Sequence, residues 1–229
     1  MLQTSNSKLQ TSVMSATTSS CARTPEPREY MPDDYFRRHS AADIFSDGNP
    51  ELPLEIDLGC GDGTFLLEMA QHYPERNFLG VERLLGRVRG VCKNIEHLGL
   101  TNAKVLRLES SYTLEWLLEK ASVSRLHLLC PDPWPKARHH KRRLVQQDFL
   151  QCLHEVLTPN GEFLFKTDHP DYHEWVCEEM QTFKKFTPLP WLGDGTADES
   201  ADAFYYPKTD FQKLWESQGK AMHQLRFGK

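Results

Sequence analysis

The stretch Leu54-Glu55-Ile56-Asp57-Leu58-Gly59-Cys60-Gly61-Asp62-Gly63-Thr64 decides the fold of this chain. Its first five residues are typical of a buried strand, and the amphipathic pattern from Thr64 to Tyr73 predicts a helix that Pro74 ends. The glycines between the two elements let a ligand approach the backbone at the N-terminus of the helix. Taken alone, the same glycines also fit a tight turn that binds nothing.

Outward from this stretch, strands and helices alternate along the chain. The predicted strands are Leu54 to Leu58, Asn77 to Glu82, Ala103 to Leu108, Arg125 to Cys130 and Glu162 to Lys166. The predicted helices after the first are Leu84 to Leu98, Thr113 to Lys120, Leu144 to Leu157 and Asp171 to Thr182. Such alternation predicts a parallel sheet that is covered by helices on both faces.

The last part of the sequence has a different pattern. Residues Thr187 to Lys208 predict a long loop, and we interpret it as a candidate substrate loop because loops of this length in a compact domain are often functional. A short helix, Asp210 to Ser217, and an alternating run, Ala221 to Phe227, follow it. We expect this run to form a last antiparallel strand of an α/β fold.

The composition indicates one globular domain. Of the 229 residues, 39% are hydrophobic and 26% are charged, which is enough apolar material for a core. No run approaches the roughly 18 apolar residues of a membrane span. Six cysteines without a CxxC pair predict reduced thiols, as in a cytoplasmic protein. The net charge of −5 argues against nucleic-acid binding through overall charge, but not through a local patch.

The first 50 residues differ from the domain that we expect over residues 51–229. Met1 to Thr24 contain eleven Ser or Thr residues and no acidic residue, which predicts a disordered tail rather than a transit peptide. Four prolines in residues 25–50 predict an extended segment over the surface of the core.

Carboxylates near the ends of the predicted strands indicate a positively charged ligand. Glu55 and Asp57 precede the glycines, where they would repel a pyrophosphate and attract a sulfonium and an ammonium group. This favours S-adenosylmethionine over a dinucleotide. Glu82 ends the second strand, where it could accept from a ribose diol, and Glu109 follows the third, where it could accept from an adenine amino group. A solvated strand end is the alternative for Glu82.

A proline-rich loop and a basic run follow the fourth strand, over residues 131–143. The prolines hold Asp132 in a rigid loop at the carboxyl edge of the sheet, beside Trp134. Behind it, five basic residues and two histidines lie within eight positions. The basic residues are Lys136, Arg138, Lys141, Arg142 and Arg143. This local patch predicts binding of nucleic-acid phosphates, and a solvated charged face is the alternative.

These motifs resemble those of the tRNA (guanine-N7-)-methyltransferases of bacterial type, from about Leu54 to the C-terminus. The segments that carry the resemblance are Glu55-Ile56-Asp57-Leu58-Gly59-Cys60-Gly61, Phe78-Leu79-Gly80-Val81-Glu82, Pro131-Asp132-Pro133-Trp134-Pro135-Lys136 with the basic run, Thr167-Asp168 and Thr209-Asp210-Phe211-Gln212. The resemblance implies a class I S-adenosylmethionine-dependent methyltransferase with a Rossmann-like fold of seven strands. Such an enzyme would transfer a methyl group to N7 of a guanine in the variable loop of tRNA.

The resemblance also implies roles for single residues. It makes Asp132 the catalytic residue. The expected cofactor site consists of Glu55, Gly59, Gly61, Glu82, Glu109 and Asp132. The residues expected to contact tRNA are Lys136, Asp168, Thr209, Asp210, Phe211 and Gln212, next to Arg138, Arg142 and Arg143 of the basic run. Two positions depart from the family pattern, which usually has an acid in place of Gln212 and Asp or Asn in place of Glu109.

The chemistry of such a transfer agrees with these residues. Guanine N7 has a free lone pair at neutral pH, so the reaction requires alignment rather than a general base. Positive charge passes to the purine, and a carboxylate that accepts from its N1–H therefore stabilises the transition state. Asp132 and Asp168 each follow a strand and suit this role. Capping of the helix that begins near Pro170 is the alternative for Asp168.

Two other functions stay open: a methyltransferase of a small metabolite, and a non-catalytic RNA-binding module. We expect no metal, because Pro170 places His169 before the helix that carries His173 and Cys177. The expected partner is tRNA, with no membrane and no obligate protein partner. We expect a cytoplasmic monomer or homodimer.

Overall fold

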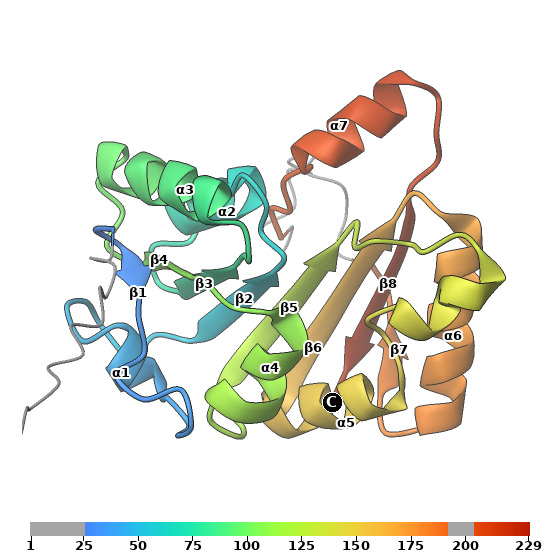
Figure 1. Ribbon diagram of the computed structural model, residues 1–229, viewed down its shortest axis with the longest axis horizontal. Helices are drawn as coiled ribbons and strands as arrows, with labels where there is room; N and C mark the ends of the chain where they lie inside the picture. Colours follow the sequence, from blue (N-terminus) through green and yellow to red (C-terminus); the bar gives the residue numbers. More distant parts are fainter. Residues whose placement is uncertain (1–25, 192–203) are drawn as a thin grey trace, which may run out of the picture.

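A mostly parallel sheet of eight strands forms the centre of the computed structural model, which describes residues 26–191 and 204–229 (Figure 1). The strand order is β1-β4-β3-β2-β5-β6-β8-β7. The strands are β1 (Glu29–Tyr30), β2 (Leu54–Leu58), β3 (Asn77–Val81), β4 (Ala103–Leu106), β5 (Val123–Leu129), β6 (Leu157–Thr167), β7 (Thr187–Leu189) and β8 (His223–Gly228). Strands β1 to β6 are parallel, and β8 is antiparallel to both of its neighbours. The predicted α/β class and final antiparallel strand are confirmed, with eight strands rather than seven.

Helices cover both faces of this sheet. They are α1 (Ala41–Ile44), α2 (Thr64–His72), α3 (Leu85–His97), α4 (Ser110–Tyr112), α5 (Gln147–Val156), α6 (Pro170–Phe183) and α7 (Asp210–Ser217), with a π-helical turn at Thr113–Leu117 and a 3-10 helix at Ala137–Arg142. The buried residues of α2 and α3 share one apolar cluster with β3 and β4, and those of α1, α5 and α6 belong to a second cluster. None of the described helices is both long and apolar enough to cross a membrane.

The segment predicted to be extended over residues 25–50 contributes to the fold rather than only crossing its surface. β1 joins the edge of the sheet beside β4, and α1 follows it. Ile44 and Phe45 are fully buried in the core. The predicted tail, Met1 to Thr24, lies outside the described residues.

The predicted long loop, Thr187 to Lys208, begins as a strand. β7 pairs with β8, and the rings of Trp191 and Tyr206 pack edge to face with centroids 5.3 Å apart. Tyr206 is fully buried, so the chain that leads into α7 is held against the sheet. Residues 192–203 of the predicted substrate loop lie outside the described part.

β2 carries two carboxylates on one face, and the first of them, Glu55, is buried in an ion network. Its carboxylate accepts hydrogen bonds from Arg76 (2.8 Å), Arg125 (3.0 Å) and His127 (2.8 Å). Burial alone would raise the pKa of Glu55, but these three partners bring it below its ordinary value. Because a carboxylate only accepts, His127 donates from Nε2 and accepts from the Tyr206 hydroxyl at Nδ1, 3.0 Å away.

We predict that Glu55→Gln lowers the free energy of unfolding by about 3 kcal/mol, because it removes the charge that Arg76, Arg125 and His127 share. Urea unfolding measures the change. Glu75→Gln is the matched control: Glu75 is 63% exposed and lies 3.9 Å from the same Arg76, so its loss should cost less than about 0.5 kcal/mol. Equal losses in the two variants would contradict the role of the network.

Candidate functional site

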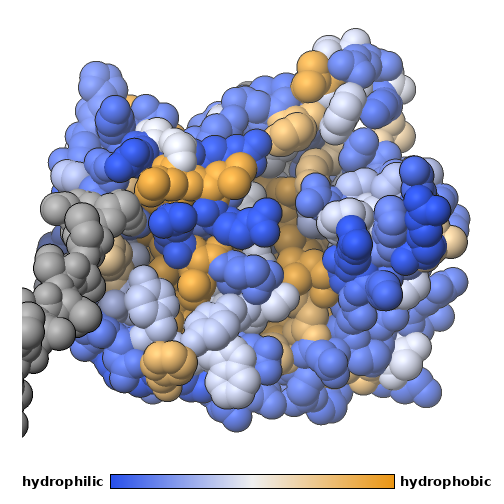
Figure 2. All heavy atoms as spheres, viewed as in Figure 1, coloured by the Kyte–Doolittle hydropathy of each residue, from blue (hydrophilic) through white to orange (hydrophobic). Residues whose placement is uncertain are grey.

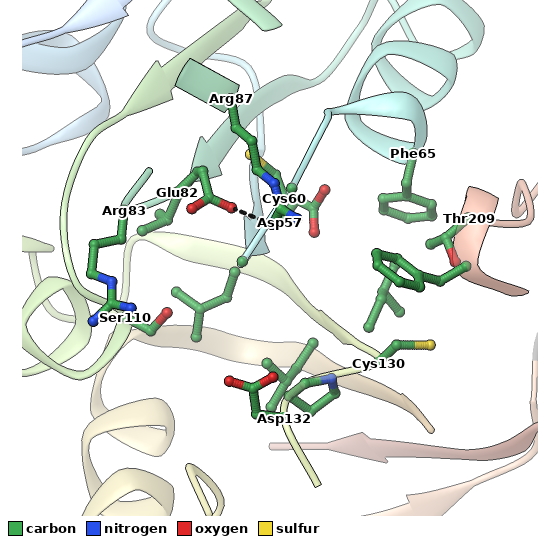
Figure 3. A pocket seen from close by; sticks show the side chains of 18 of the residues that line it. Asp57, Cys60, Phe65, Glu82, Arg83, Arg87, Ser110, Cys130, Asp132 and Thr209 are labelled. Carbon is green, nitrogen blue, oxygen red and sulfur yellow. Dashed lines mark ion pairs between the residues drawn. The ribbon is translucent and has the colours of Figure 1, made fainter. Parts of the chain in front are cut away.

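The carboxyl ends of β2, β3, β4 and β5 surround one pocket, with a cavity volume of about 600 Å³ (Figure 3). Open parallel sheets bind their ligands at this edge. The first turn of α7 closes another side of the pocket. The predicted site residues in the pocket wall are Gly59, Gly61, Glu82, Glu109, Asp132, Arg142, Thr209, Asp210 and Phe211.

The glycine-rich turn after β2 leaves its backbone open toward the pocket. Gly59 and Gly61 have φ of +87° and +59°, which favour glycine, and a Cβ atom on either would meet only open space. Gly63 serves packing instead, since a Cβ atom there would lie 2.6 Å from Val91 of α3. The backbone amide of Gly59 donates to the Val81 carbonyl oxygen at 2.8 Å, which fixes the turn against β3.

Three carboxylates concentrate negative charge beside this turn. Asp57, at the end of β2, is only 4% exposed, and burial, with the charges of Asp62 and Glu82, raises its pKa to about 7. Glu82 accepts from the backbone amide of Leu84 at 2.7 Å, and its Oε2 lies 3.6 Å from Arg87 Nη1. None of the ion pairs among the described residues includes Asp57, so its charge can balance a bound cation.

S-adenosylmethionine, the ligand expected from the sequence, fits these residues in charge and in shape. Asp57 is a buried acceptor that forms no ion pair with any of the described residues, and the bare backbone at Gly59 and Gly61 leaves space that side chains would fill. Glu82 and Glu109 present further carboxylates in the same wall. Oε2 of Glu109 also accepts from the backbone amide of Tyr112, in α4, at 2.8 Å.

The structure does not bring Glu55 into the pocket, contrary to its predicted role in cofactor binding. Alternation along β2 puts Glu55 and Asp57 on the same face of the sheet, but only Asp57 reaches the carboxyl edge. The carboxylate of Glu55 instead pairs with the side chains of Arg76, Arg125 and His127. Asp57, which the predicted cofactor residues leave out, lines the pocket.

Asp132 lies across the pocket from Glu82, in the loop that follows β5 (Figure 3). Two residues of this loop, Cys130 and Trp134, have left-handed backbone with φ of +50° and +45°, a region that few residues other than glycine adopt. The backbone amide of Cys130 donates to the Lys166 carbonyl oxygen at 2.8 Å. Burial raises the pKa of the Cys130 thiol to about 11, so the thiol is a neutral packing group.

The basic run lies beside the pocket, and its residues have different surroundings. Arg142 lines the pocket, with its guanidinium carbon 5.0 Å from the ring centroid of Trp134. Lys136 and Arg138 are exposed outside the pocket wall. Arg143 is only 2% exposed, which argues against its predicted contact with a tRNA phosphate. Figure 2 shows hydrophilic side chains gathered on the right, where the 3-10 helix lies, next to a central hollow.

Asp168 and Gln212 lie outside the pocket wall, although both are predicted to contact tRNA. Asp168 Oδ2 lies 3.6 Å from Lys220 Nζ, and the N-cap of α6 is His169 rather than Asp168. Gln212 is 1% exposed, so its predicted contact with tRNA is not supported. Its side chain accepts from Lys166 at 3.1 Å and donates to Glu216 at 2.8 Å, which joins α7 to β6.

Sequence reasoning missed the way in which α7 is fixed over the pocket. Thr64, the first residue of α2, donates from Oγ1 to Asp210 Oδ2 at 2.8 Å and so joins the glycine-rich turn to α7. Thr209 caps α7 by accepting from the Gln212 amide at 3.0 Å. Sequence reasoning also missed four other residues of the pocket wall, Asp62, Arg83, Arg87 and Ser110. All four follow the ends of predicted strands, and this position is the signal that could have found them.

We predict that the ligand-free protein loses stability as pH rises from about 4 to 7. The folded state holds the proton of Asp57 more tightly than the unfolded state, whose aspartyl pKa is near 3.9, so the free energy of unfolding falls across this window and levels off above it. The effect amounts to roughly 4 kcal/mol. Asp57→Asn should remove it and be more stable than the wild type near pH 8.

Unfolding experiments between about pH 5 and pH 8 measure this difference between the wild type and Asp57→Asn. Asp62→Asn is the control, because it keeps the Asp57 carboxyl and removes only a neighbouring charge. A stability difference between wild type and Asp57→Asn that stays constant with pH would contradict the raised pKa of Asp57.

Comparison with known proteins identifies relatives of this chain. Residues 51–225 match the family described as putative methyltransferase. The tRNA (guanine-N(7)-)-methyltransferase of Syntrophotalea carbinolica is 35% identical over 196 residues, which are 82% of this chain and 81% of that protein. The tRNA (guanine-N(7)-)-methyltransferase of Aeromonas hydrophila is 33% identical over 78% of this chain and 70% of that protein.

A solved structure has the same fold. The crystal structure of the 16S rRNA methyltransferase KamB matches with a TM-score of 0.59 at 16% identity, over 83% of this chain and 94% of that chain. At this identity the likeness shows the fold alone, which is the Rossmann-like fold expected from the sequence. The match over residues 51–225 and the two curated relatives show more: the chain belongs to the methyltransferase family of the tRNA (guanine-N(7)-)-methyltransferases.

Proposed function

We propose that this chain transfers a methyl group from S-adenosylmethionine to N7 of a guanine in the variable loop of tRNA. The observation that carries the proposal is a pocket that holds Asp132 and a buried carboxylate, Asp57, with no ion-pair partner among the described residues. The exposed side chains of Lys136, Arg138 and Arg142 lie in and beside its wall. The relatives support the same activity, since both are named tRNA (guanine-N(7)-)-methyltransferases.

The pocket residues hold the cofactor by charge and hydrogen bonding. S-adenosylmethionine supplies a methyl group activated on a positively charged sulfur. Asp57 and the glycine-rich turn hold the charged half of the molecule, and Glu82 and Glu109 accept from ribose and adenine. A cation beside Asp57 favours the ionised carboxylate, so ligand binding lowers the pKa of Asp57 from its value of about 7.

Asp132 acts on the guanine rather than on the methyl group. N7 needs no deprotonation, and positive charge on the purine makes its N1–H and amino group stronger donors as the reaction proceeds. A carboxylate that accepts from them binds the transition state better than the ground state. The loop with left-handed Cys130 and Trp134 fixes this carboxylate before the substrate arrives.

The surface around the pocket suits a base that leaves the RNA stack. Phe211 is 51% exposed in the pocket wall, so its aromatic ring is available for stacking. The exposed side chains of Lys136 and Arg138 bind flanking phosphates and hold the RNA in place.

The same features oppose the two alternative functions. A methyltransferase of a small neutral metabolite does not require exposed basic side chains beside its pocket. A non-catalytic RNA-binding module does not require a buried carboxylate that can balance the charge of a cationic ligand. In this proposal the chain works in the cytoplasm, as a monomer or homodimer without an obligate partner subunit.

The test combines purified protein, S-adenosylmethionine with a labelled methyl group and unmodified tRNA transcripts. Chain cleavage selective for N7-methylguanosine then locates the label, and free guanosine nucleotide is the control substrate. Label confined to one guanine of the tRNA supports the proposal. Label on the free nucleotide or at another atom would reject the tRNA substrate, and tight tRNA binding without transfer would favour the RNA-binding module.

We predict that Asp132→Asn lowers turnover by about tenfold or more and leaves the affinity for tRNA nearly unchanged, because the amide oxygen carries no full charge to stabilise the purine. Single-turnover rates and tRNA binding measure the two effects. Asp148→Asn, at an exposed position of α5 outside the pocket, is the control. Unchanged turnover in Asp132→Asn would remove Asp132 from the reaction.

A further inference from the structure

Arg142 and Arg143 are neighbours at the end of the basic run but lie in different surroundings. Arg142 is exposed and lines the pocket above Trp134. Arg143 is 2% exposed, and its Nη2 is buried without a hydrogen-bond partner among the described residues. A phosphate outside the protein can therefore reach the guanidinium of Arg142 but not that of Arg143.

The guanidinium of Arg143 lies in a slot between two aromatic rings of α6. Its central carbon is 5.0 Å from the ring centroid of Tyr172 and 5.3 Å from that of Trp175. The backbone amide of Val145 donates to the Tyr172 hydroxyl oxygen at 3.3 Å, and Trp175 Nε1 donates to the Val145 carbonyl oxygen at 2.7 Å. Both rings are thus fixed to the chain that follows the basic run.

Two hydrogen bonds of Arg143 join the loop that carries Asp132 to α6. Nε donates to the carbonyl oxygen of Pro133 at 2.9 Å, and Nη1 donates to the carbonyl oxygen of Asp171 at 3.2 Å. The first bond holds the loop that carries Asp132, and the second holds the first turn of α6.

The bond to Pro133 holds the part of the loop where the backbone is strained. Left-handed φ values at Cys130 and Trp134 persist only where surrounding contacts fix them. On one side of the loop, the amide of Cys130 donates to β6. On the other side, the Arg143 bond fixes the carbonyl group that directly precedes Trp134. Asp132 lies between these two fixed points.

We propose that Arg143 is a positioning residue, which holds the Pro131–Pro135 loop so that the Asp132 carboxylate is in place when the guanine enters. This inference rests on the proposed function and replaces the phosphate contact expected from the sequence. A planar guanidinium stacks between two rings and donates in two directions at once, and a lysine ammonium cannot do both. The shape of the side chain at position 143 therefore matters more than its charge.

Arg143→Lys tests the proposal, because it keeps the charge and removes the planar group. We expect kcat for tRNA methylation to fall about 10- to 100-fold, as for a displaced catalytic group, with the KM for tRNA and its salt dependence unchanged. Arg89→Lys, at an exposed position outside the pocket wall, is the matched control and should leave both constants unchanged. Arg142→Gln should instead raise KM and reduce the slope of log KM against log salt by about 0.7 to 0.9.

A phosphate-binding Arg143 would behave in the opposite way. Lysine would then substitute with near-normal kcat, and Arg143→Gln would reduce the salt slope as Arg142→Gln does. Either result would overturn the proposal.

A second measurement does not depend on activity. In protein labelled with fluorotryptophan, the fluorine resonance of Trp134, assigned with Trp134→Phe, reports the conformation of the loop. Arg143→Lys should shift or broaden this resonance, while unchanged affinity for S-adenosylmethionine shows that the variant is folded. If Arg143→Lys does not fold, Trp175→Phe, which alters one wall of the slot, should move the same resonance.

The two measurements separate the inference from the function on which it rests. An unchanged Trp134 resonance in both variants would overturn the positioning role of Arg143, whatever the activity. A wild-type protein that does not methylate tRNA but whose Trp134 resonance moves in Arg143→Lys would contradict the proposed function and leave the loop contact in place.

Discussion

Asp57, near the end of the central strand β2, is a buried carboxylate whose pKa is raised by burial and by the charges of Asp62 and Glu82. Burial and like charge make its ionised form unfavourable in the ligand-free protein, and a bound cation reverses this. The surrounding structure keeps that place accessible. The glycines after β2 leave the backbone bare, and the hydrogen bond from Thr64 to Asp210 holds α7 at the side of the cavity. The fold thus places a buried carboxyl and open backbone side by side in one cavity, an arrangement that suits a positively charged ligand.

Position within an element, rather than residue type, separates the functional residues from the structural ones. Glu55 and Asp57 share a strand and a face, yet one accepts from Arg76, Arg125 and His127 and the other lines the pocket. Arg142 and Arg143 are adjacent, yet one is open to a ligand and the other supports the catalytic loop from behind. In both pairs, the member nearer the carboxyl edge or the solvent lines the pocket, and its neighbour bonds to other parts of the protein.

The sequence predicts the elements that carry strong periodicity, and β2 and α7 have the predicted bounds. It does not predict β1 and β7, since two or three residues are too few for a pattern. The position of the pocket follows from the rule that ligands bind at the carboxyl edge. The burial of Arg143 could not be predicted, because Tyr172 and Trp175 approach it only in the folded chain. The pairing of Gln212 with Lys166 also depends on tertiary contacts.

The raised pKa of Asp57 in the ligand-free protein is the central claim, and the protons exchanged on cofactor binding test it most directly. Calorimetric titration with S-adenosylmethionine in buffers of different ionisation enthalpy counts these protons. Near pH 6, Asp57 is protonated in the ligand-free protein, so binding should release about one proton per ligand. The release should vanish above about pH 8 and in Asp57→Asn. Binding without proton release near pH 6, or equal release from Asp57→Asn, would contradict the account.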